Sequence, residues 1–119
     1  MAKKKKKAAS NTLEIQNAAK TMLANIRFAS VDSPMQSVVI TSSIPNEGKT
    51  TTTIELAKAI ASSGNSVLLV EADMRRRSAA SALGVRASHG AYAVMANQIT
   101  LQEAVVSAGV PNFYFLDTE

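Results

Sequence analysis

The sequence lacks several features that mark particular classes of protein. It contains no cysteine, which excludes disulfide bonds and thiolate metal sites. No apolar run approaches the roughly 18 residues of a membrane span, and no apolar segment follows the early lysines as it would in a signal peptide. Aromatic residues make up only 4% of the chain, and none stands beside the lysines to stack on nucleic-acid bases. We therefore expect a cytoplasmic protein.

Positive charge is concentrated at one end of the chain. The lysines at positions 3–7 are five of the 13 basic residues, which leaves eight against nine acidic residues in the remainder. That remainder is not a basic nucleic-acid-binding surface, so no specific nucleic-acid partner is expected. We predict a disordered basic tail at 1–11 and one modest domain at 12–119. The alternative for Lys3 to Lys7 is contact with an anionic membrane, where each lysine contributes about 1 kcal/mol.

Apolar spacing predicts helices, and short β-branched or aromatic runs predict strands. Helices are expected at 13–29, 50–63 and 100–108, shorter helical segments within 75–87 and at 90–96, and strands at 36–42, 66–71 and 112–117. This alternation predicts an α/β fold, a parallel sheet with helices on both faces. Because only three strands are visible, we expect the sheet to be truncated after the third.

A polar loop joins the strand at 36–42 to the helix at 50–63. It ends in Gly48-Lys49-Thr50, as the phosphate-binding P-loop does, although Ser43 stands at the position of the first P-loop glycine. Backbone amides here can converge on phosphate oxygens, and the helix N-terminus adds about half a positive charge. The alternative is an ordinary strand–helix turn. We predict a P-loop NTPase-like nucleotide site formed by Pro45, Asn46, Glu47, Gly48, Lys49, Thr50 and Thr51.

Two carboxylates, Glu71 and Asp73, follow the strand at 66–71, and Arg75 comes after them. The carboxyl ends of parallel strands line the ligand crevice in sheets of this kind. Carboxylates at that edge can hold Mg²⁺ through water or accept a proton from a nucleophile. A solvated loop is the alternative.

The segment "TSSIPNEGKTTTTIELAKAIASSGNSVLLVEADMR" resembles the cytoplasmic ATPase domain of bacterial tyrosine kinases that govern capsule and exopolysaccharide synthesis. The Pro-x-Glu-Gly-Lys-Thr loop and the acid-x-Asp-x-Arg strand end carry this resemblance. It implies an ATP and Mg²⁺ site that transfers the γ-phosphoryl group to tyrosine. Lys49 and Thr50 would clamp phosphates and metal, Asp73 would order Mg²⁺, and Glu71 stands where the family has the aspartate thought to activate the tyrosine hydroxyl.

The resemblance also implies partners: a membrane-anchored polysaccharide co-polymerase that acts as activator, protein tyrosine substrates, and further copies of the chain. The sequence departs from the family at several places. Glu71 replaces an aspartate, and no later strand carries the third acidic motif, which only Asp117 could imitate. The oligomerisation motif of the first helix appears as Asn17, Lys20 and Leu23, and no tyrosine cluster is present.

Three functional hypotheses follow. The first is a protein-tyrosine kinase that regulates polysaccharide biosynthesis, and the second is a catalytically degenerate nucleotide-binding regulator. The third is a partition or positioning ATPase. We expect the chain to be either the N-terminal part of a longer kinase-like protein or a truncated product.

Overall fold

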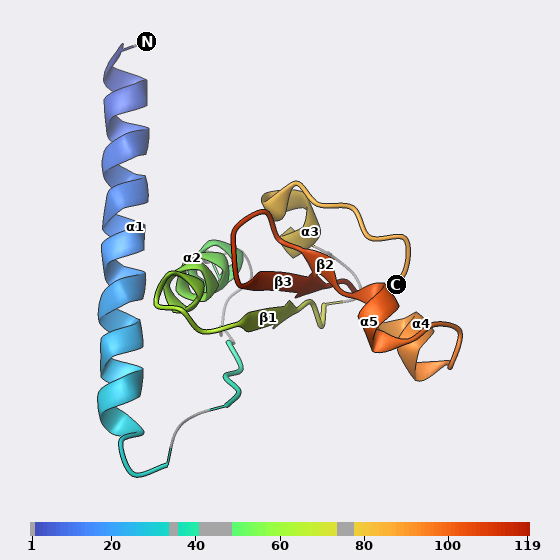
Figure 1. Cartoon of the computed structure of the whole chain (residues 1–119). Helices are drawn as coiled ribbons and strands as arrows, with labels where there is room; N and C mark the ends of the chain where they lie inside the picture. The colour runs from blue at the N-terminus through green and yellow to red at the C-terminus, as the bar shows by residue number, and fades with distance from the viewer. Residues whose placement is uncertain (1, 34–35, 41–48, 74–77) are drawn as a thin grey trace. The chain divides into compact units, whose positions relative to one another are not determined.

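The structure, a computed structural model, describes residues 2–33, 36–40, 49–73 and 78–119, with side chains from residue 13 onward (Figure 1). The chain divides into two compact units, Met1–Ala59 and Ile60–Glu119, and each is described by itself. The helices and strands are, in chain order, α1 (Ala2–Ala29), α2 (Lys49–Ser62), β1 (Val67–Val70), α3 (Ser78–Leu83), α4 (Ala91–Met95), α5 (Leu101–Ala104), β2 (Val106–Ser107) and β3 (Phe113–Leu116).

Helix α1 confirms the helix predicted at 13–29 and extends it toward the N-terminus. It begins at Ala2, so residues 2–11 are helical where we expected a disordered tail. Lysine and alanine are good helix formers, and neither glycine nor proline occurs before Pro34. The helix ends where the Ser30 N–H donates to the Ile26 carbonyl at 3.1 Å. The division into a tail and a domain remains a prediction.

The strand predicted at 36–42 is not formed by residues 36–40, the part of it that the structure describes. Val38 and Val39 are 45% and 89% exposed, which no buried strand would allow. A β-branched run becomes a strand only when a neighbouring strand accepts and donates its ladder hydrogen bonds. The described part of the first unit contains no other strand. The prediction was therefore wrong for these residues.

Helix α2 confirms the helix predicted at 50–63. Ile54, Ala57 and Ala61 are buried at helical spacing, as expected of an amphipathic helix. Gly64 follows the helix with φ at +96°, and its N–H donates to the Ala61 carbonyl at 3.1 Å. A left-handed glycine is the usual way to end a helix.

The sheet lies in the second unit, with β3 between β1 and β2 (Figure 1). β1 pairs with β3 in parallel, from Val67 opposite Phe113 to Val70 opposite Leu116. This pairing confirms the strands predicted at 66–71 and 112–117 and their parallel direction. The carboxyl ends of both strands therefore meet at one edge of the sheet.

Strand β2 was not predicted and makes the sheet mixed. The helix predicted at 100–108 ends at Ala104, and Val106 pairs antiparallel with Phe115. Gly109 and Asn112 have φ angles of +96° and +67° and return the chain through a tight turn. Because the β-branched Val106 can pair with β3 across this turn, strand pairing replaces the last helical turns.

Most of the core of the second unit lies against the face of β3 that carries Phe113 and Phe115, and on the other face Leu116 is also buried. Phe113 and Phe115 are fully buried, and burial of each such side chain contributes about 1.5–3 kcal/mol. The opposite face carries Leu68, Val70 and Tyr114, which are 42%, 48% and 42% exposed. Among the described residues, none of the helices combines the length and apolar composition needed to cross a membrane.

Candidate functional site

The first turn of α2 holds the described part of the predicted nucleotide site. Pro45 to Gly48 lie outside the described residues. Lys49 is the first residue of α2 and is exposed, Thr50 is half-buried, and Thr51 is exposed. The N–H groups of a first helical turn have no intrahelical partners and can bind anions. The structure thus places Lys49 and Thr50 in the first turn of α2.

The run of four threonines at residues 50–53 lowers the stability of α2, because threonine is a poor helix former. The structure accounts for the last one. The Thr53 hydroxyl donates to the Lys49 carbonyl at 2.7 Å, an i to i−4 bond within α2 that satisfies the hydroxyl locally. This bond also fixes the main chain at Lys49.

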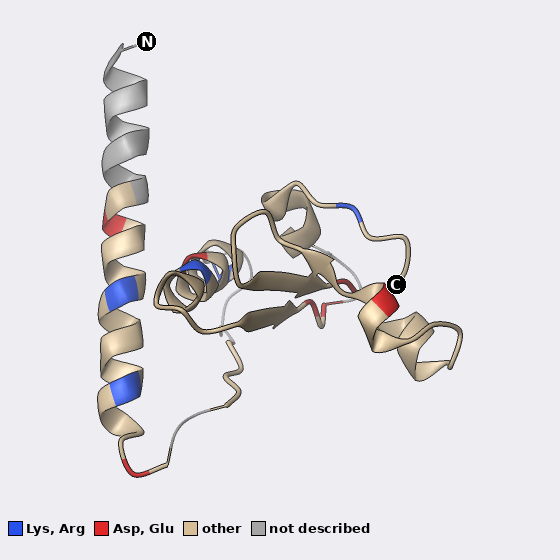
Figure 2. Ribbon diagram, in the orientation of Figure 1, with Lys and Arg blue, Asp and Glu red and all other residues tan. Residues whose placement is uncertain are grey.

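Acidic residues follow both parallel strands (Figure 2). Glu71 comes directly after β1, and its N–H donates to the Leu116 carbonyl at 3.0 Å, which extends the ladder by one residue. Asp117 comes directly after β3. The sheet therefore brings Glu71 and Asp117 to the same edge, as predicted for carboxyl ends of parallel strands.

Both carboxylate oxygens of Glu71 accept backbone hydrogen bonds. Oε1 accepts the N–H of Asp73 at 3.1 Å, and Oε2 accepts the N–H of Ala79 at 2.9 Å. Ala79 is buried in the first turn of α3, so Glu71 satisfies a donor of that turn. Sequence patterns did not reveal this contact, because a backbone donor eight residues away leaves no side-chain signature.

Asp117 is fully buried. Its Oδ1 accepts the Thr118 N–H at 2.7 Å and lies 3.5 Å from the Thr118 hydroxyl. The Asp117 carbonyl accepts the N–H of Ala91 at 2.7 Å. These bonds hold the chain after β3 against the start of α4.

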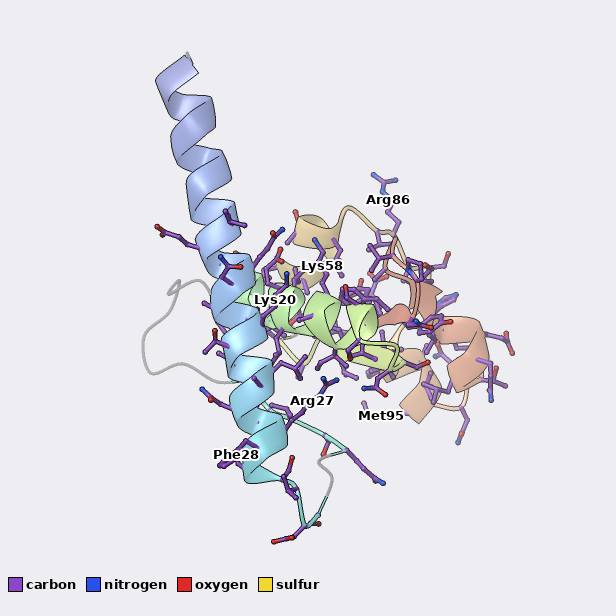
Figure 3. All side chains as sticks on the ribbon, turned by 60° about the vertical axis from the view of Figure 1, so that its left-hand side comes forward. Lys20, Arg27, Phe28, Lys58, Arg86 and Met95 are labelled. Atoms are coloured by element: carbon purple, nitrogen blue, oxygen red, sulfur yellow. The ribbon has the colours of Figure 1, made fainter. Side chains whose placement is uncertain are left out.

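A pocket of about 480 Å³ lies beside Asp117 in the second unit. Its wall is formed by the end of α3 and the turn after it, including Ser81, Gly84 and Arg86. Arg86 is exposed and its side chain points away from the ribbon (Figure 3). The pocket is a hollow next to the carboxyl end of β3.

The described residues offer few metal ligands. No three of their Asp, Glu, His or Cys side chains lie close enough together to hold a metal ion. Mg²⁺ in nucleotide sites is commonly bound by one or two protein oxygens together with phosphates and water. Thr50 in the first unit and Asp73 in the second each carry an oxygen of the kind that Mg²⁺ binds.

Comparison with known proteins gives consistent matches. The family model described as AAA domain matches residues 35–119. The tyrosine-protein kinase YwqD of Bacillus subtilis (strain 168) is 41% identical to the chain over 86 residues, which are 72% of this chain and 36% of that protein. The chain thus spans little more than a third of the length of this relative.

Among solved structures, the crystal structure of the chimerical protein CapA2B2 is similar to this one. The TM-score is 0.77 at 32% sequence identity, over 83% of this chain and 43% of that chain. This likeness confirms the predicted α/β fold class, and the named relative confirms the predicted resemblance to bacterial tyrosine kinases.

Proposed function

The chain belongs to the AAA domain family, of the P-loop NTPase type, and on this premise we propose that it is the nucleotide-binding part of a bacterial protein-tyrosine kinase. The reaction would transfer the γ-phosphoryl group of Mg-ATP to a tyrosine hydroxyl. One observation carries the proposal: 41% identity over 86 residues to a protein named as a tyrosine-protein kinase. That span contains more than two thirds of this chain.

In this proposal the loop at 45–48 and the first turn of α2 bind the polyphosphate. Backbone N–H groups there would donate to the anionic oxygens. The Lys49 ammonium would lie against the β and γ phosphates, where it stabilises the charge that develops during transfer. Its exposed position on the first turn of α2 supports this role. Thr51 would add a further donor to the phosphates.

Thr50 and Asp73 are the proposed holders of Mg²⁺. When bound, this ion would neutralise charge on the β and γ phosphates. The Thr50 hydroxyl would contribute one oxygen directly, and Asp73 would act through water. Asp73 suits this role because it follows β1 at the carboxyl edge of the sheet, where ligands bind in parallel sheets.

The biological setting is part of the proposal and derives from the family resemblance. The chain would act in capsule or exopolysaccharide biosynthesis, with a membrane-anchored activator protein, protein tyrosine substrates and other copies of itself as partners. Lys3 to Lys7 would add attraction to an anionic membrane surface.

A second candidate function is favoured by the contacts of Glu71. The family's proton-accepting aspartate is replaced by a glutamate whose two oxygens each accept a backbone N–H. A chain in which this group is engaged elsewhere could bind nucleotide and regulate a partner without catalysis.

Radiolabelled ATP separates these functions. The chain is incubated with Mg²⁺ and γ-labelled ATP, and labelled protein is analysed for phosphoamino acids. A kinase yields phosphotyrosine, and Lys49→Ala lowers its formation by on the order of 10²-fold or more, because a phosphate clamp is lost. Lys58→Ala is the matched control. Lys58 lies on the same helix but beyond its first turn, and its ammonium is 3.6 Å from Glu55 Oε1.

The other outcomes assign the other functions. Nucleotide binding that Lys49→Ala abolishes, without phosphotyrosine or released phosphate, identifies the regulator. Released phosphate without labelled protein identifies a partition-type ATPase. If Mg-ATP and Mg-ADP leave the thermal unfolding of the folded chain unchanged, the nucleotide site itself is wrong.

A further inference from the structure

The Glu71 side chain joins the end of β1 to two later points of the chain. One oxygen accepts the N–H of Asp73 at 3.1 Å, and the other accepts the N–H of Ala79 at 2.9 Å. The first contact lies two residues along and the second lies eight residues along. Glu71 therefore bonds to the main chain at both Asp73 and Ala79. Its own main chain is fixed as well, because its N–H donates to the Leu116 carbonyl at 3.0 Å.

The length of the glutamate side chain matters for the second contact. An aspartate can accept the N–H of the residue two positions along, as in an Asx turn. Its carboxylate is one C–C bond, about 1.5 Å, nearer to the main chain. With the backbone in place, an aspartate at position 71 would leave the Ala79 N–H beyond the roughly 3.2 Å limit of a good hydrogen bond. Only the longer side chain spans both donors.

We propose that Glu71 is a positioning residue that holds Asp73 and the first turn of α3, and that it is not the group that accepts the tyrosine proton. The proposal rests on the proposed function, since it divides the roles of two carboxylates within that site. The main-chain N–H of Asp73 makes one of the two contacts, so Glu71 acts through the orientation of Asp73. One main-chain N–H already donates to each oxygen of the Glu71 carboxylate, so a substrate hydroxyl would have to share an oxygen with one of these donors.

Amide hydrogen exchange on the full chain tests the contact without any need for activity. In Glu71→Asp, the Ala79 amide should exchange roughly tenfold faster or more, whereas the Asp73 amide should change much less. In Glu71→Gln, a single carbonyl oxygen remains as acceptor, so at least one of the two amides should exchange faster. Glu14→Asp is the matched control, because Glu14 is exposed on α1 and the same change there should affect neither amide.

The result that overturns the proposal is equally specific. If Ala79 exchanges in Glu71→Asp at the rate of the parent chain, Glu71 does not hold α3. Far-ultraviolet circular dichroism and thermal unfolding establish that each variant is folded. Should Glu71→Asp not fold, Glu71→Gln, which has nearly the same shape, is read in its place, and unchanged exchange at both amides then overturns the proposal.

Turnover separates positioning from proton acceptance. Glu71→Asp keeps the Asp73 contact, so it stays active under either role, and Glu71→Gln decides between them. If Glu71 positions Asp73, Glu71→Gln keeps one acceptor oxygen, retains the acidic limb of the pH–rate profile and needs more Mg²⁺ for half-maximal rate. If Glu71 is the proton acceptor, Glu71→Gln loses on the order of 10²–10⁴-fold in turnover together with the acidic limb. If the parent chain forms no phosphotyrosine, the proposed kinase function fails while the exchange experiment still decides the role of Glu71.

Discussion

At the scale of single residues, position 90 requires glycine because of a close contact and not because of its backbone conformation. Its φ of −143° is open to any residue, but a Cβ there would overlap the carbonyl oxygen and carbon of Asp117. We expect Gly90→Ala to lower the free energy of unfolding by about 1–3 kcal/mol, because an added methyl in a closely packed place forces the backbone apart. Urea-induced unfolding measures the difference.

Gly84 is the matched control for Gly90. It has φ at +68°, and nothing lies within 4 Å of the place that a Cβ would occupy, so Gly84→Ala is costly only through its left-handed backbone. Asparagine tolerates that backbone region better than alanine does. Gly84→Asn should therefore be milder than Gly84→Ala, whereas Gly90→Asn should be at least as harmful as Gly90→Ala. Equal behaviour at the two positions would contradict the steric explanation.

The sequence predicted the position of residues that belong to a local motif. Lys49 and Thr50 were expected at the opening of a helix, and they stand in the first turn of α2. The second bond of Glu71 was beyond such reasoning, because the donor is the main chain of Ala79. Any residue other than proline could supply that N–H, so only the folded chain reveals it.

At the scale of elements, the start of α5 depends on Thr100. Its Oγ1 accepts the N–H of Glu103 at 3.2 Å, and its hydroxyl lies 3.0 Å from Glu103 Oε1. Thr-x-x-Glu is the spacing of a capping box, and Thr100 is the N-cap of α5. We expect Thr100→Ala to cost about 0.5–2 kcal/mol of unfolding free energy and Thr100→Ser to cost less, since serine keeps the acceptor oxygen. A Thr100→Ser variant as unstable in urea as Thr100→Ala would rule out the cap as the cause.

The two ends of α5 differ in how far the sequence could predict them. The N-terminus of α5 depends on a contact between residues three positions apart, Thr100 and Glu103, so it can be recognised in the sequence. The C-terminus depends on β2, whose Val106 pairs with Phe115, and this pairing competes with further helical turns. Two valines, then Ser-Ala, then Gly-x-Pro-Asn and an aromatic run fit a hairpin as well as a helix stop. The nonlocal pairing decided between them.

At the scale of the whole molecule, the same distinction applies to the strands. β1 and β3 were predicted because each is a short apolar run bounded by turn residues, and each found the other as a partner. The run that contains Val38 and Val39 is also short and apolar, as β1 and β3 are, yet residues 36–40 form no strand. Composition reports that a segment can pair. Whether it does depends on a neighbour that the local sequence does not specify.

The alternation of faces along β3 gives a final prediction about the second unit. Phe115 is fully buried and Tyr114, the residue before it, is 42% exposed on the opposite face. Phe115→Ala should cost about 3–5 kcal/mol, because it removes a ring from a packed core and leaves a cavity. That is a large part of the roughly 5–15 kcal/mol that stabilises a typical domain, so we expect protection of β1 and β3 amides from hydrogen exchange to fall together.

Tyr114→Ala on the same strand is the control for this change, with the same backbone and the same pairing. It removes a side chain that is already 42% exposed, so we expect a clearly smaller loss, of about 1 kcal/mol. Equal losses of unfolding free energy in the two variants would mean that the face bearing Tyr114 is covered when the protein is in solution. Since strands alternate their side chains between two faces, the ratio of the two losses measures directly which face of the sheet carries the core.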